Sequence, residues 1–152
     1  MKTKLIILAL YLAASFAVAE DIDYRAALKR AHDRLNYLET ERRDYRKPRP
    51  ELPPDLERER LQLIGRLTED DPLWVLSRDL EADIGAFAVA PDRTPADTAT
   101  LDQLKDLLAI VAGVVDVPTS RDQATRFSAA LRTFILRRDV SGASAWIKQS
   151  PK

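Results

Sequence analysis

The residues that could carry out chemistry in this chain are few, and their types exclude most catalytic and metal sites. Among 152 residues there is no cysteine and a single histidine, His32. Thiol catalysis, disulfides, cysteine-ligated zinc and c-type haem attachment are therefore excluded. One histidine cannot form a histidine metal cage, and the chain has no glycine-rich phosphate loop and no Gly-x-Ser-x-Gly motif. We expect no metal, no cofactor and no catalytic set.

Paired carboxylates are the one enzymatic alternative that these residue types leave open. Helical enzymes that cleave peptidoglycan glycans use a glutamate as the general acid, often with a second carboxylate. Glu69 and Glu81 are the candidates, because each stands near an apolar helix face of the kind that such an acid uses. Neither glutamate lies in an aromatic-rich, glycine-punctuated segment that would form a glycan cleft. We therefore predict that the protein is not an enzyme.

The densest charge feature is a basic cluster over residues 42–49, in which Asp44 is the only acid. The cluster consists of Arg42, Arg43, Arg46, Lys47 and Arg49. Cations at the end of a helix complement its dipole and stay solvated, which needs no partner. They could also bind anionic lipid headgroups, lipid A phosphates or an acidic protein surface. Both interpretations stay open.

The first nineteen residues have the three parts of a secretory signal peptide. Lys2 and Lys4 precede an uncharged run over 5–19, which ends in Ala17-Val18-Ala19. We expect cleavage after Ala19 and export to the periplasm or beyond. A run of that length is shorter than the ~20 residues that a spanning helix needs. The net charge of the chain is zero, so there is no basic field to recruit nucleic acid.

Residues 20–47 are predicted to form a charged helix with a narrow apolar seam. The seam residues recur at steps of four and three, and they are Tyr24, Leu28, Ala31, Leu35 and Leu38. Such a seam packs either on the protein's own bundle or on a partner helix, from a second copy or another protein. Its narrowness favours a single partner helix. Together with Tyr37, just off the seam, and the basic cluster, we predict that Leu28, Leu35 and Leu38 bind a partner.

Prolines over 48–54 predict a stiff connector, and residues 55–149 are predicted to form the bundle core. Helix starts are indicated at Asp71-Pro72, at the capping box Thr100–Gln103, and at a second box that begins at Ser120. The stretch 107–115 carries no charge on any face, which predicts a central, buried helix. Asp139 and Ser141-Gly142 are expected to break the pattern before a last turn or two.

These features predict an all-α protein, a small bundle of about five helices plus a short C-terminal helix. With no catalytic constellation, we expect an exported binding protein that acts as an accessory, chaperone-like or inhibitor/immunity factor. Its partner is another envelope or exported protein, or a second copy. A weak contact with anionic membrane surfaces is a further expectation, and nucleic acid is not expected.

Overall fold

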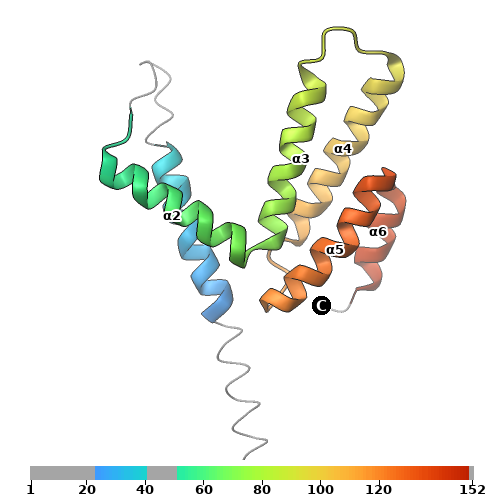
Figure 1. Ribbon diagram of the computed structural model, residues 1–152. Helices are drawn as coiled ribbons and strands as arrows, with labels where there is room; N and C mark the ends of the chain where they lie inside the picture. Colours follow the sequence, from blue (N-terminus) through green and yellow to red (C-terminus); the bar gives the residue numbers. More distant parts are fainter. Residues whose placement is uncertain (1–22, 41–50, 151–152) are drawn as a thin grey trace, which may run out of the picture. The chain divides into compact units, whose positions relative to one another are not determined.

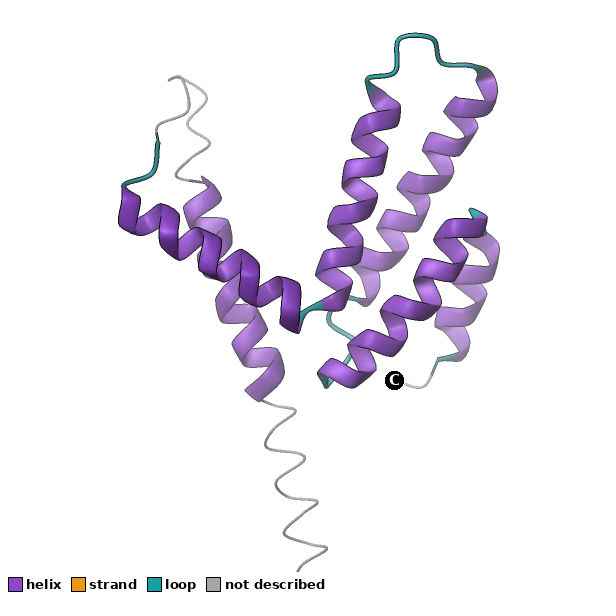
Figure 2. Ribbon diagram, in the orientation of Figure 1, coloured by secondary structure: helices purple, strands orange, loops and turns teal. Residues whose placement is uncertain are grey.

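The computed structural model describes residues 23–40 and 51–150, and all regular elements within these ranges are helices (Figures 1 and 2). A helix over 23–40 is followed by α2 (Pro54–Asp70), α3 (Pro72–Ala88), α4 (Pro95–Val114), α5 (Arg121–Arg137) and α6 (Val140–Gln149). The prediction of an all-helical fold is confirmed. None of the described helices combines the length and the apolar character that a membrane span requires.

The chain divides into two compact units that meet between Gly65 and Arg66, within α2. The first unit contains the helix over 23–40 and the first part of α2, and the second contains the end of α2 with α3 to α6. Residues 51–53 are not helical, and Pro54 occupies the first position of α2. Proline is tolerated there because the backbone N–H that it lacks would have no acceptor within the helix. The predicted signal peptide over 1–19, the basic cluster and the remainder of the predicted connector lie outside the described residues.

The second unit is built around leucines that recur every three or four residues on α3 and α4. Leu73, Leu76 and Leu80 of α3 are buried with a row of α4 residues, Leu104, Leu107, Val111 and Val114. The two helices form an antiparallel pair (Figure 1). Phe127 and Leu131 of α5 and Ala143 of α6 complete this core. Removal of these apolar side chains from water is the main stabilising contribution.

Asp71 and Pro72 start α3 as predicted. The Asp71 carboxylate is buried and accepts a hydrogen bond from the backbone N–H of Trp74 at 3.1 Å. Pro72 follows at the first helical position. The hydroxyl of Ser128 donates to the carbonyl of Pro72 at 3.3 Å, so α5 is fastened to the beginning of α3.

The predicted start of α4 at Thr100 is wrong, because the helix begins earlier, at Pro95. Thr94 is the N-cap, and its hydroxyl accepts a hydrogen bond from the Asp97 N–H at 3.2 Å. The Asp97 carboxylate accepts the Thr94 N–H in return at 2.9 Å. A threonine before proline, with an acid three positions on, is itself a helix-start signal. The sequence prediction overlooked this signal and placed the start of the helix at Thr100.

Two further predicted boundaries differ in part from the structure. Ser120 is the N-cap of α5 as expected, but the side chain of Gln123 accepts the N–H of Thr119 rather than completing a box. The predicted break at Ser141-Gly142 is wrong, because both residues lie within α6. Asp139 caps this helix through the N–H of Gly142, at 2.7 Å. A Cβ at position 142 would collide with that carboxylate, so glycine suits a close approach here.

The prediction that the stretch 107–115 is buried on every side is also wrong. Leu107, Val111 and Val114 point into the core, but Ala109 and Ala112 are exposed. An uncharged helix surface is not always a buried one, since much of any protein surface is apolar. This uncovered side of α4 is the feature from which the candidate site is built.

We predict that Leu76→Ala lowers the free energy of unfolding by ~3 kcal/mol, because it leaves a cavity in a well-packed core. Leu76 is 1% exposed. Leu136→Ala is the matched control, since Leu136 is 79% exposed on α5, and it should change stability by less than ~0.5 kcal/mol. Denaturant unfolding followed by circular dichroism measures both variants. Equal losses would contradict the assignment of this core.

Candidate functional site

The seam of the helix over 23–40 is largely covered by the folded chain. Ala31, Leu35 and Leu38 are buried, with Leu38 at 0% exposure, and Leu28 is half-buried. Tyr37 is 53% exposed, and the guanidinium of Arg34 lies 5.3 Å from the centre of its ring. Of the partner-binding residues predicted on the described part of this helix, Tyr37 is therefore the one that reaches solvent most.

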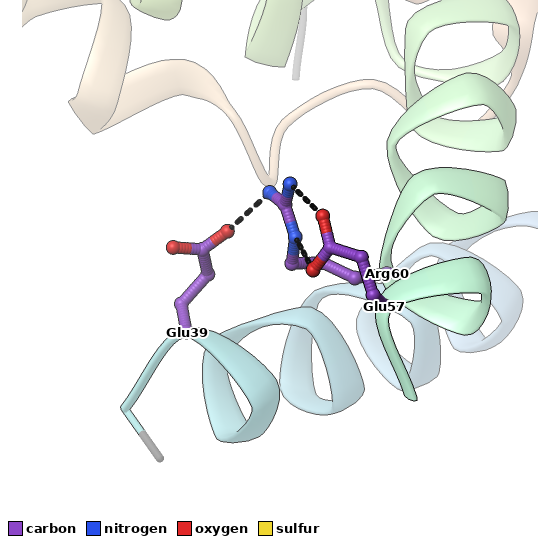
Figure 3. A network of polar contacts seen from close by, with 3 residues as sticks. All are labelled: Glu39, Glu57 and Arg60. Atoms are coloured by element: carbon purple, nitrogen blue, oxygen red, sulfur yellow. Dashed lines mark hydrogen bonds and ion pairs between the residues drawn. The ribbon is translucent and has the colours of Figure 1, made fainter. Parts of the chain in front are cut away.

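Ion pairs join this helix to α2. Arg34 forms two parallel hydrogen bonds with the Glu59 carboxylate, at 2.7 and 2.8 Å. Arg60, whose side chain is only 14% exposed, bonds both Glu57 of α2 and Glu39 of the N-terminal helix (Figure 3). Its distances to these partners lie between 2.8 and 3.0 Å. Leu35 and Leu38 lie on the same turns as these pairs, so charged contacts border the buried part of the seam.

These contacts shift the ionisation of the groups that make them. Hydrogen bonds to Glu57, opposed by partial burial and reinforced by Glu39, raise the pKa of Arg60 above its ordinary value. The hydrogen bond from Arg34 lowers the pKa of Glu59 below its ordinary value. Arg60 stays charged at any physiological pH. The first unit thus has a permanent cation between two helices.

The second unit contains an open groove of about 510 Å³ along α3 and α4. Apolar residues of α4 and polar side chains of both helices line it. They are Ser77, Glu81, Lys105, Leu108, Ala109, Ala112, Val115 and Asp116. No residue of α5 or α6 belongs to this lining. The groove is therefore formed by the side of α4 that was predicted, wrongly, to be buried.

Helical periodicity explains why these residues share one surface. Along α4 and just past its end, the lining residues follow one another at spacings of one and three, which places them on one side of the helix. Ser77 and Glu81 of α3 stand one turn apart. At 1.5 Å per residue, the stretch from Lys105 to Asp116 extends over roughly 16 Å, or about three helical turns. Two helices that share a core hold this surface in a fixed shape.

Charged groups stand at the edges of the groove, and their balance is acidic. In the part of the chain that the structure describes, Glu81 and Asp116 have no hydrogen-bond or ion-pair partner. Lys105 lies 4.0 Å from Asp102 on its own helix, so its charge is partly offset. The lining therefore offers two available carboxylates around an apolar floor.

The structure treats the two glutamate candidates differently. Glu81 is exposed and lines the groove, whereas Glu69 is exposed on α2 and is not part of the lining. The pair is not brought together at this groove. Within residues 23–40 and 51–150, no group of three or more His, Asp or Glu side chains is arranged to hold a metal ion. The sequence signal for the groove was the uncharged stretch 107–115 with its small residues Ala109 and Ala112.

Comparison of the chain with models of protein families, with curated proteins and with solved structures gives no match.

We predict that Arg60→Gln loosens the helix over 23–40. Hydrogen bonds to charged groups contribute ~1.5–3 kcal/mol each, so loss of the Arg60 bridge should speed amide exchange there by at least about tenfold. Arg58→Gln is the matched control, because Arg58 is exposed on α2, the helix of Arg60, and has no described ion pair. Hydrogen exchange of the full chain is the measurement. Unchanged exchange in Arg60→Gln would contradict the bridge.

A second prediction concerns pH. Glu59 should titrate below its ordinary pKa of 4.5, and Arg34→Gln should bring the pKa back toward that value. Because the pKa of Glu59 is lower in the folded state, the ion pair with Arg34 adds to the free energy of unfolding above pH 4.5. This contribution is lost as the pH falls through the lowered pKa. Carboxyl NMR titration of the full chain measures both proteins. A Glu59 pKa that Arg34→Gln leaves in place would rule out this pairing in solution.

Proposed function

We propose that this chain is an exported, non-enzymatic binding protein of the bacterial envelope that acts through protein–protein contacts. It serves as an accessory, chaperone-like or inhibitor factor. The groove along α3 and α4 is the observation that carries this proposal. The expectation of export rests on the sequence of residues 1–19.

The chemistry of the groove suits a macromolecular partner. Its apolar floor of Leu108, Ala109, Ala112 and Val115 gains free energy when a partner displaces water from it. The charged groups at its edges fix orientation and select among partners. Because the groove is open to solvent rather than an enclosed cavity, an extended surface such as a helix of another protein fits it better than an enclosed small molecule.

The groove is also preorganised. Leu76, Leu80, Leu107 and Val111 are almost completely buried behind it, so α3 and α4 do not have to be ordered when a partner arrives. Less conformational entropy is lost on binding to such a surface than on binding to a mobile one. A rigid groove between packed helices is a recurrent mode of protein recognition.

We predict that substitution in the groove abolishes partner capture. The full chain, tagged at its C-terminus and cross-linked in the cells that produce it, should retain a protein at a fixed stoichiometry. Ala112→Glu, which places a charge on the apolar floor, should lose that protein. Ala129→Glu is the matched control on α5, since both alanines are exposed on helices, and it should retain the protein.

The set of captured proteins distinguishes the roles. One stoichiometric partner indicates an inhibitor or accessory factor, and many weakly held proteins indicate a chaperone. Capture that Ala112→Glu leaves unchanged, or no stoichiometric capture at all, would contradict the proposal.

A second candidate function is cleavage of peptidoglycan, and the position of Glu81 in an open groove favours it. If Glu81 is the general acid, the wild-type chain should clear a turbid peptidoglycan suspension and Glu81→Gln should leave it turbid. Activity that survives this change would remove Glu81 from the candidates. A wild-type chain without activity leaves binding as the function of the groove.

A further inference from the structure

We propose that the groove binds a basic amphipathic helix of about three turns, which packs as a third helix against α3 and α4. This inference rests on the proposed binding function and names the chemistry of the partner. Length, apolar pattern and charge of the groove each support it.

The length of the groove matches a short helix. Its lining runs from Lys105 of α4 to Asp116, just after the end of that helix, and a partner helix of about eleven residues covers the same distance. Ala109 and Ala112 are small, so they allow another helix to approach α4 closely between the larger Leu108 and Val115. A partner with apolar side chains at positions i, i+4 and i+7 can place all three along this floor.

The charges of the groove determine the sign of the partner. Glu81 and Asp116 are the two carboxylates of the lining without a described partner, and Lys105 is close to Asp102. Because α3 and α4 are antiparallel (Figure 1), Glu81 lies toward the Lys105 end of the groove and Asp116 at the other end. Lysine or arginine at both ends of the partner's apolar stripe complements this arrangement, whereas acidic residues there are repelled.

Two labelled, alanine-based peptides of about 16 residues provide the test, since short helices are marginal in water unless their surroundings stabilise them. Both contain leucines at i, i+4 and i+7. One has two lysines at each end of the leucine stripe, and the other has glutamates there. Fluorescence anisotropy with the full chain measures their affinities, and circular dichroism shows whether the bound peptide becomes helical.

We expect the lysine peptide to bind at least about fivefold more tightly than the glutamate peptide at low salt. At 1 M salt, where the Debye length is ~3 Å, the difference should fall below about twofold. The double variant Glu81→Gln/Asp116→Asn should also remove the preference. Asp83→Asn/Asp92→Asn changes the net charge equally at exposed positions outside the groove, and it should keep the preference.

Each other outcome bears on the inference. Equal affinities for both peptides would overturn it, as would lysine-peptide binding that Ala112→Glu leaves unchanged. Self-association of the chain that light scattering detects and that Ala112→Glu abolishes would assign the groove to a second copy instead. If Ala112→Glu abolishes cellular capture while the peptides bind equally, the binding function stands and the basic helix is excluded as the partner.

Discussion

Leu76 and Leu80 of α3 pack with Leu107 and Val111 of α4, and the position of every other element in residues 72–150 depends on this contact. This contact holds α3 and α4 together as an antiparallel pair (Figure 1). Phe127 and Leu131 of α5 join the same core, and Trp146 of α6 packs its ring edge-to-face on Phe127, 5.1 Å between centres. The elements that cover this core leave the groove side of α3 and α4 open.

An open groove in a protein without disulfides has to be compatible with stability, and its residue types explain how that is achieved. Ala109 and Ala112 expose little apolar area to water because their side chains are single methyl groups. Larger residues at these positions would add exposed apolar surface and fill the groove. The small residues thus limit the apolar surface exposed to water and keep the groove open. Glu81 and Asp116 at the edges add charge, which opposes non-specific association.

The first unit shows that an apolar seam can be recognised from sequence while the surface that covers it stays open. The spacing of Leu35 and Leu38 predicted an apolar seam that packs either on the chain itself or on a partner helix. In the structure these side chains are buried within the chain, near the ion pairs that Arg34 forms with Glu59 of α2 and that Arg60 of α2 forms with Glu39. A short amphipathic helix such as α2 is itself a narrow partner. The role of the basic cluster over 42–49 in binding an anionic surface stays a prediction.

The sequence by itself determined the helical class, most of the helix starts and the residues of the core. Local chemistry suffices for these features: Asp71-Pro72 caps α3 wherever it stands, and leucines at every third or fourth position make one apolar side. The start of α4 was equally local and was available in Thr94-Pro95 and Asp97. Tertiary structure alone decided which side of α4 would be covered, because an uncharged helix surface has the same pattern whether a neighbour packs on it or not. The groove, with Glu81 from one helix and Asp116 after another, exists only because α5 and α6 pack elsewhere on the α3–α4 core.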